Sequence, residues 1–324
     1  MRFVQLRHAT EGRAVALVEG DTLALARDYS TAYDLIQGLR REQIHIRSRL
    51  KYDDVYLGHS EWRILPAFDH PAEPARCLVS GTGLTHISSA ATRQAMHGAE
   101  QQETDSMRMY RWGVEGGHPQ GDAIGTAPEW FYKGDGSILR GHGDALTVPW
   151  FAEDGGEEAE IAGVYVIDPD GVPVRVGMAI GNEFSDHKFE RRNYLYLAHS
   201  KLRECAIGPE LVLDGEFGLV RGEVKLERNR SVIWFREIAS GAERMCHSLA
   251  NIEHHHFKYP QHRRPGDVHI HFFGADSFSF GAGIALQDGD LVEIAFEGFG
   301  RPLRNRVAVE SRTAERVTVR AFGV

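Results

Sequence analysis

The chain has 324 residues, of which 42% are hydrophobic and 26% charged, and its formal net charge is −9. This is the composition of a soluble globular protein with room for one large or two modest domains. The acidic balance argues against nucleic acid or an anionic membrane as a partner, because both need a basic face. Three widely spaced cysteines exclude a disulfide framework or a CxxC zinc motif. With no signal-peptide pattern and no run of about 18 apolar residues, a cytoplasmic location is expected.

A small α+β domain is predicted at residues 1–72. Alternating apolar runs at 2–7, 13–20 and 22–27 predict strands, and the segment 30–50 predicts a helix with Ser30 or Thr31 as its N-cap. The proline-rich stretch 65–77 is typical of a linker, so a second domain is predicted at 73–324.

Residues 94–127 are polar and show little periodicity. So long a connection in a compact domain favours a functional loop or lid, with simple disorder as the alternative. The rest of the second domain is rich in strand patterns and punctuated by glycines, and few helices are expected in it.

A β-hairpin that gathers carboxylates is predicted within residues 155–189, where two β-branched runs flank the turn sequence DPDG. Glu158 and Glu160 share one strand face, with Cα atoms about 6.5–7 Å apart. If Ile167 pairs with Val172, Glu183 lies on the same face and diagonal to Glu158. Three such carboxylates favour a hard cation such as Mg²⁺, Mn²⁺ or Ca²⁺. The alternatives are an acidic, solvated hairpin mouth or a one-residue register slip that moves Glu183 to the other face.

Several motifs together resemble the fumarylacetoacetate hydrolase superfamily. They are Glu158-Ala159-Glu160, Asn182-Glu183-Phe184-Ser185, Lys201 before Gly208-Pro209, the Lys133 segment 128–149 and the closing segment 286–307. The stretches LVSGTGLTH, GHGDAL and NYLYLAHSK are similar to the branch of 2-keto-3-deoxypentonate dehydratases, which includes the AraD1 group. The resemblance covers residues 75–308. It implies an α+β, mostly β fold, a mixed β-sandwich roll behind a small N-terminal domain, commonly a homodimer.

The resemblance also implies a set of site residues. The metal, expected to be Mg²⁺, would be held by Glu158, Glu160 and Glu183, the last replacing the usual aspartate. His86 and Lys201 are the catalytic candidates, and substrate binding is assigned to Lys133, Thr82 and Ser185. His86 is chosen because imidazole titrates near neutrality.

The implied function is a metal-dependent lyase that dehydrates a 2-keto-3-deoxy sugar acid through an enolate, with a small 2-keto acid as its substrate. Two alternatives stay open: a hydrolase that cleaves a C–C bond of a 2,4-diketo acid, and a catalytically inactive small-molecule-binding protein. The hydrolases pair His86 with a glutamate three residues later, but this chain has Ser89 there, which disfavours C–C hydrolysis.

Six histidines fall within residues 253–273 and suggest a rival metal site. The segment 243–257 predicts a helix in which His254, His255 and His256 are consecutive, so their rings diverge and cannot chelate one ion. His269 and His271 share a strand face, which leaves open a place for them at the border of the pocket. The carboxylates are therefore the preferred metal ligands.

Overall fold

The computed structural model describes residues 1–38, 44–97, 104–311 and 313–322. Within them a larger sheet has the order β4-β3-β2-β1-β13-β11-β10-β16-β6-β7, with β5 beside β1 and β12 joining β11 to β8. A smaller sheet has the order β15-β14-β17-β18-β9. One apolar core contains residues from both sheets, including Ile161 and Val292. The mostly β, α+β fold predicted from the sequence is confirmed.

The strand bounds are as follows, in chain order. They are β1 Arg2–His8, β2 Gly12–Glu19, β3 Thr22–Ala26, β4 Ile46–Lys51, β5 Arg63–Ile64, β6 Cys77–Gly81, β7 Phe131–Asp135, β8 Leu139–Arg140, β9 Ala145–Val148, β10 Ala159–Ile167, β11 Pro173–Asn182, β12 Cys205–Ile207, β13 Leu211–Val212, β14 Val220–Arg228, β15 Ser231–Ser240, β16 Val268–Phe272, β17 Leu291–Phe296 and β18 Leu303–Val309. The helices are α1 Ala32–Gly38, α2 Tyr52–Tyr56, α3 Ile87–His97, α4 Asp105–Gly116, α5 His187–Arg192, α6 Leu197–Lys201 and α7 Leu249–Phe257.

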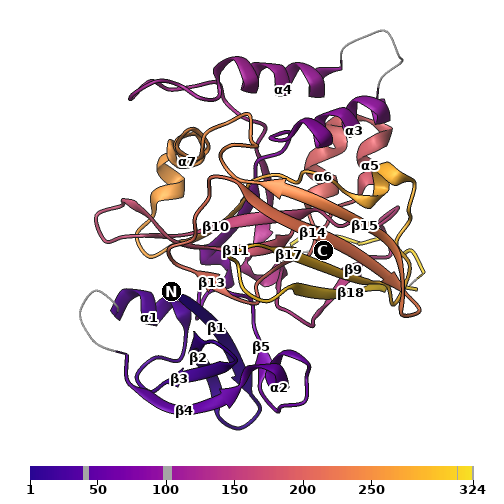
Figure 1. Ribbon diagram of the computed structural model, residues 1–324. Helices are drawn as coiled ribbons and strands as arrows, with labels where there is room; N and C mark the ends of the chain where they lie inside the picture. Colours follow the sequence, from indigo (N-terminus) through magenta and orange to yellow (C-terminus); the bar gives the residue numbers. More distant parts are fainter. Residues whose placement is uncertain (39–43, 98–103, 312, 323–324) are drawn as a thin grey trace.

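The N-terminal module lies at one end of the molecule, opposite α3 and α4 (Figure 1). Its strands β1 to β4 form a meander around a core of their own, which includes Leu6, Leu25 and Tyr52. Strand β1 also pairs with β13, so the module is hydrogen-bonded to the sheet that carries the hairpin. The domain boundary near residue 72 stays a prediction.

The helix predicted at 30–50 is correct only at its start. Thr31 caps it, accepting a hydrogen bond from the Asp34 amide at 3.1 Å, and α1 is described as far as Gly38. Residues 39–43 lie outside the described residues. Ile46–Lys51 is strand β4, because tertiary pairing with β3 outweighs the local helical pattern.

The segment 94–127, predicted to be a long functional loop or lid, is partly helical, and its role as a lid stays a prediction. Helix α3 ends at His97, residues 98–103 lie outside the described residues, and α4 follows at Asp105–Gly116. Thr104 caps α4 by accepting a hydrogen bond from the Met107 amide. The polar composition concealed these helices because α4 lies at the surface, at the end of the molecule (Figure 1).

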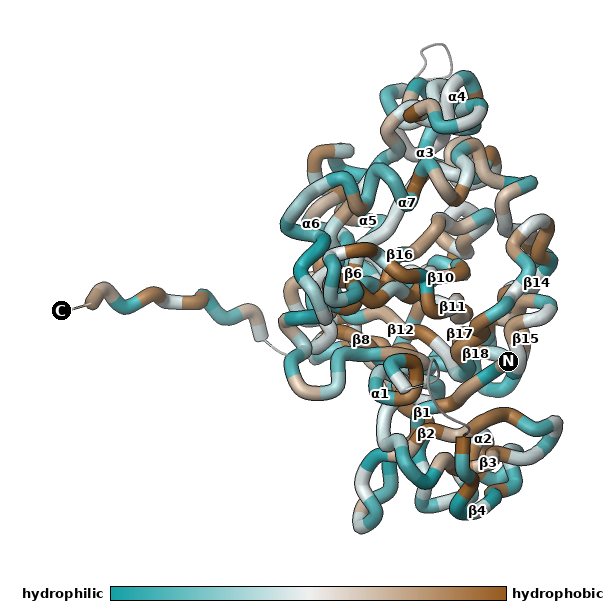
Figure 2. Tube along the Cα trace, turned by 90° about the vertical axis from the view of Figure 1, so that its left-hand side faces the viewer, coloured by the Kyte–Doolittle hydropathy of each residue, from teal (hydrophilic) through white to brown (hydrophobic). Residues whose placement is uncertain are grey.

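Hydropathy along the trace matches this architecture (Figure 2). Strands β10, β11 and β16 run through the middle of the molecule, and residues 313–322 extend away from it. Every residue of β10 is buried, so this strand is covered on both faces. No helix in the described part of the chain is long and apolar enough to cross a membrane.

The histidine-rich segment forms a shorter helix than predicted. Helix α7 begins at Leu249 because the Ser248 hydroxyl caps it, and residues 243–248 form turns. His269 and His271 pair with Tyr165 and Gly163 of β10, on the face of the sheet opposite to Glu160. They therefore do not face the carboxylates, and a place for them beside the substrate pocket stays a prediction.

Buried neutral imidazoles instead form a structural cluster. His256 Nε2 lies 2.9 Å from His269 Nδ1, and His271 sits between the hydroxyls of Ser80 and Thr82 at 2.9 and 2.8 Å. Burial lowers the pKa of His269 to about 4 and that of His271 to about 3, while the pKa of His256 is lowered by burial and then by its imidazole neighbours.

This cluster predicts acid sensitivity. An unfolded histidine takes up a proton below about pH 6.5, whereas these folded ones do not, so stability present above pH 6.5 is lost as the pH falls. Between pH 7.5 and 5.5 each should contribute a loss of about 1 kcal/mol in the free energy of unfolding. Urea unfolding at the two pH values should show a smaller loss for His271→Gln than for the wild type. The exposed His254→Gln is the matched control, and equal losses in all three proteins would contradict the prediction.

Candidate metal centre and active site

Three buried glutamates converge at the open end of the β10–β11 hairpin. Glu158, Glu160 and Glu183 each offer a carboxylate oxygen, and these oxygens lie within 4.8 Å of one another. Their relative exposures are 6%, 1% and 0%. The predicted convergence is confirmed, and the alternative of a solvated acidic mouth is wrong. Their role as metal ligands stays a prediction.

The convergence depends on a β-bulge that the sequence did not indicate. Ile167 pairs with Pro173, one residue beyond the predicted partner Val172. The extra residue Val176 then shifts the register again, and the Glu183 amide donates to the Glu158 carbonyl at 3.0 Å. Two one-residue shifts restore the original parity, so Glu183 faces the same way as Glu158. Either shift alone would have turned Glu183 to the opposite face.

Two buried lysines form ion pairs with the carboxylates of Glu158 and Glu183. Lys201, the last residue of α6, donates to Glu158 Oε1 at 2.6 Å, to the Ser185 hydroxyl at 2.9 Å and to Glu183. Lys133 of β7 lies 2.5 Å from Glu183 Oε1 and donates to the carbonyl of Phe184 at 2.8 Å. The structure thus brings together six of the eight residues predicted from the sequence.

Glu160 is the unpaired member of the group. Its Oε2 accepts the Gly274 amide at 2.7 Å, but its Oε1 is buried and has no hydrogen-bond partner among the described residues. Three carboxylates and two ammonium groups leave one excess negative charge in a buried volume. Burial, with repulsion from Glu158 and Glu183, raises the pKa of Glu160 well above its usual value. An all-oxygen set with an orphaned buried oxygen fits a divalent cation such as Mg²⁺.

Glu158 is held ionised. Burial alone would raise its pKa, but Lys201 and then the His187 imidazole outweigh it and hold the pKa well below its usual value. The pKa of Lys201 is raised, because its attraction to Glu158 and Glu183 exceeds the effect of burial. Glu158 and Lys201 therefore form a charged pair beside the orphaned oxygen of Glu160.

His187 was not singled out by the sequence reasoning. Its Nε2 lies 2.9 Å from Glu158 Oε1, its ring stacks on Phe278 at 4.6 Å, and it is 2% exposed. The signal was available, since His187 ends the motif NEFSDH, but a lone histidine at the start of a helix has no distinctive pattern. Its contact orients a carboxylate of the predicted metal site.

Gly156 leaves room for the His187 ring. A Cβ at Gly156 would lie 2.2 Å from His187 Nδ1, far inside van der Waals contact. We expect Gly156→Ala to displace His187 and weaken Mg²⁺ binding about tenfold, measured by calorimetric titration. Gly215→Ala, whose Cβ would come no closer than 3.3 Å to Val212, is the control. Unchanged affinity in Gly156→Ala would show that the ring position does not matter.

A second buried network of ion pairs is centred on Arg93. Arg93 of α3 donates to both oxygens of Glu129 at 2.9 and 2.8 Å, and its Nε lies 3.0 Å from Glu190 of α5. The Tyr194 hydroxyl also donates to Glu129 at 2.7 Å. The sequence analysis missed this network because its members are far apart in the chain. It ties α3, which follows His86, to α5, which carries His187.

His86 and Thr82 make their hydrogen bonds with other partners than the lysines and carboxylates. The Thr82 hydroxyl lies 2.8 Å from His271 Nε2, and Thr82 and His86 are each 1% exposed. The Ser89 hydroxyl donates to the backbone carbonyl of His86 at 2.9 Å. Ser89 therefore does not take over the role of the glutamate that the hydrolases have at this position. The roles of Thr82 and His86 stay predictions.

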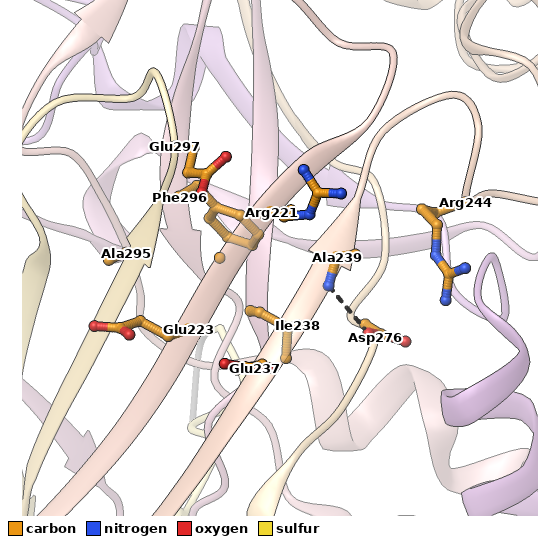
Figure 3. A pocket seen from close by; sticks show the side chains of 11 residues that line it. Arg221, Glu223, Glu237, Ile238, Ala239, Arg244, Asp276, Ala295, Phe296 and Glu297 are labelled. Carbon is orange, nitrogen blue, oxygen red and sulfur yellow. Dashed lines mark hydrogen bonds between the residues drawn. The ribbon is translucent and has the colours of Figure 1, made fainter.

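A cleft of about 780 Å³ lies on the smaller sheet (Figure 3). It is lined by residues of β14, β15 and the end of β17, and by Arg244 and Asp276. Asp276 accepts hydrogen bonds from the Ala239 amide at 3.1 Å and the Ser88 hydroxyl at 2.9 Å. Through Ser88, which follows His86 by two residues in the chain, Asp276 connects this wall of the cleft to the segment that carries His86.

Several solved enzyme structures are similar in fold to this chain. A 2-keto-3-deoxyarabinonate dehydratase in a hexagonal crystal form superposes with a TM-score of 0.73 at 20% identity, covering 96% of this chain and 100% of its own. The chain has the fold of this enzyme. A 2-keto-3-deoxy-D-arabinonate dehydratase complexed with magnesium and 2,5-dioxopentanoate matches with a TM-score of 0.72 at 21% identity and the same coverage.

The dehydratase fold recurs in an enzyme with another activity. A 5-carboxymethyl-2-hydroxymuconate delta-isomerase from Mycobacterium smegmatis matches with a TM-score of 0.59 at 17% identity, with 96% and 100% coverage. No protein-family model matches the chain, and no curated protein is similar enough in sequence to match it. The fumarylacetoacetate hydrolase type of fold, predicted from the motifs, is confirmed, whereas the reaction has to be argued from the site.

Proposed function

We propose that the chain is a magnesium-dependent hydro-lyase of the fumarylacetoacetate hydrolase superfamily that dehydrates a 2-keto-3-deoxy sugar acid. The observation that carries the proposal is the buried oxygen of Glu160, which has no partner although Glu158 and Glu183 lie within reach of the same ion. The structural likeness to a dehydratase complexed with magnesium and 2,5-dioxopentanoate supports the choice of reaction. A homodimer and a cytoplasmic location remain predictions.

The carboxylates Glu158, Glu160 and Glu183 would hold the cation. When bound, it would supply Lewis acidity where negative charge develops on a 2-keto acid that loses a proton next to its carbonyl. Lys201 and Lys133 hold Glu158 and Glu183 in place, and their positive charges also favour an anionic substrate nearby. Ser185 donates to Glu183 at 2.9 Å and completes this support.

Dehydration needs one base near the substrate. In 2-keto-3-deoxypentonate the C3–H and C4–O bonds break, a C3=C4 bond forms and water leaves with the proton. A hydrogen of C5 is then lost while C3 regains one, which moves the double bond to C4=C5, and the resulting enol tautomerises to the semialdehyde. We assign removal of the C3 proton to His86, because its Nε2 is buried and has no hydrogen-bond partner among the described residues. Ser89 supplies no carboxylate beside His86, which is a reason to prefer elimination over hydrolysis.

The test is an assay of the purified chain with 2-keto-3-deoxy-D-arabinonate, with Mg²⁺ and with a chelator. Proton NMR of the mixture should show α-ketoglutaric semialdehyde only when Mg²⁺ is present. Pyruvate as the product would indicate C–C cleavage instead. Tight binding of the keto acid without any product would favour a binding protein. Either of these two results would overturn the proposed dehydration.

A further inference from the structure

The hydroxyl of Thr85 fixes which nitrogen of His86 carries the proton. Thr85 Oγ1 donates its hydrogen to the carbonyl of Phe273 at 2.8 Å, since a carbonyl only accepts. The same oxygen lies 2.8 Å from His86 Nδ1. Because its only hydrogen is already used, Oγ1 can only accept there, so Nδ1 of His86 carries a hydrogen.

The other nitrogen of His86 is therefore the one that carries the lone pair. Burial lowers the pKa of His86 to about 4, with Asp276 opposing this shift and Arg244 adding to it, so the ring is neutral at physiological pH. With Nδ1 protonated, Nε2 of the neutral ring is unprotonated. This nitrogen is buried and has no partner among the described residues, which leaves it ready to accept a proton from a ligand.

One peptide group connects this histidine to the predicted metal site. The Phe273 carbonyl and the Gly274 amide belong to the same peptide, and the Gly274 amide donates to Glu160 Oε2 at 2.7 Å. All three hydrogen bonds point the same way: from His86 to Thr85, from Thr85 to the peptide, and from the peptide to Glu160. Aligned hydrogen bonds polarise one another, so the three bonds couple Nδ1–H of His86 to Glu160 Oε2.

Gly274 is required for this arrangement. It has φ of +96°, and a Cβ there would lie 2.0 Å from the Thr85 hydroxyl oxygen and 3.0 Å from the Thr82 carbonyl. The hydroxyl is thus enclosed by the glycine, the Phe273 carbonyl and the imidazole, and Thr85 is fully buried. The loop from Cys246 closes the other side, with its amide donating to the Thr85 carbonyl at 2.8 Å.

We propose that Thr85 is a positioning residue that holds His86 as the Nδ1-protonated tautomer and couples it to Glu160 through the Phe273–Gly274 peptide. The assignment of His86 as the base rests on the proposed function, but the tautomer and its coupling do not. The chain Glu160–peptide–Thr85–His86 plays the part that a carboxylate plays for the histidine of a hydrolytic triad. It orients the His86 ring, a role that Ser89 cannot fill although it occupies the position of the hydrolases' glutamate.

The direct test is nitrogen-15 NMR of the imidazoles in the Mg²⁺-loaded protein at pH 7.5. The His86 signals are identified by their absence from His86→Gln. We expect a protonated Nδ1 and an unprotonated Nε2 in the wild type and in Thr85→Ser, and loss of that preference in Thr85→Val. A proton on Nε2 in the wild type, or an unchanged tautomer in Thr85→Val, would overturn the proposal. The wild-type spectrum decides even if Thr85→Val does not fold.

Kinetics supply the second readout, with 2-keto-3-deoxy-D-arabinonate as the probe. Thr85→Val should lower kcat about tenfold to a hundredfold, Thr85→Ser should restore it to within about threefold of the wild type, and Mg²⁺ affinity should not change. Equal kcat in all three proteins would overturn the coupling. The expected tautomers without turnover in any of them would overturn the proposed reaction and leave the tautomer assignment standing.

Discussion

Glu160→Gln is expected to lose divalent-cation binding while the protein stays folded. The glutamine carbonyl oxygen can still accept the Gly274 amide, but the orphaned oxygen becomes an amide nitrogen that cannot bind a cation. Two ammonium groups then balance two carboxylates, so the metal-free protein should melt at the same temperature or higher. Calorimetric titration should show Mg²⁺ affinity lower by at least about a hundredfold, and turnover should be lost with it.

The adjacent Glu157 provides the matched control. It is equally buried, but it points to the opposite strand face, where it accepts hydrogen bonds from the Ser279 amide and hydroxyl at 2.6 and 2.8 Å. Glu157→Gln removes a carboxylate from the residue directly before Glu158, in the segment that leads into β10, yet cation binding should persist. Equal loss in both variants would mean that overall charge, and not coordination by Glu160, governs binding.

Lys201→Met should give the largest loss of stability in the metal-free protein. The ammonium group contacts Glu158, Glu183 and Ser185, and its side chain is 0% exposed. Removing it leaves three buried carboxylates with one lysine, Lys133, which pairs with Glu183. Breaking a buried pair in this way costs about 3–5 kcal/mol. Urea unfolding in a chelator should report this loss. Added Mg²⁺ should recover part of it, because the ion replaces the missing positive charge.

The exposed Lys51 is the control for that experiment. It pairs with Asp54 at 3.6 Å on the surface, where ion pairs contribute between zero and about 1 kcal/mol. Lys51→Met should therefore unfold almost as the wild type does. A loss below about 1 kcal/mol in Lys201→Met would show that the carboxylates are neutral in the folded protein.

The candidate site could be predicted from the sequence because its key geometry is local. Glu158 and Glu160 share a face by the period of two in a strand, and the turn sequence places Glu183 near them whichever register the hairpin takes. The register itself could not be predicted, since neither the five-residue turn nor the bulge at Val176 has a clear sequence signal. The predicted face of Glu183 was correct only because the turn and the bulge each shift the register by one residue, and the two shifts cancel.

Long-range contacts account for most of what the sequence did not reveal. Arg93, Glu129 and Glu190 belong to separate elements, and only folding brings them together. The strand β4 was mistaken for helix because its pairing with β3 decides its structure. The histidines of α7 and β16 suggested a metal site, but their ring nitrogens bind hydroxyls, a carbonyl and one another.

The central claim is that Glu158, Glu160 and Glu183 hold one divalent cation. The most direct measurement is anomalous diffraction from crystals of the chain grown with Mn²⁺, with Glu160→Gln crystals treated in the same way. We expect a single strong peak in the wild type at bonding distance from all three carboxylates, and none there in Glu160→Gln. No peak at the three glutamates, or an equal peak in the variant, would contradict the account.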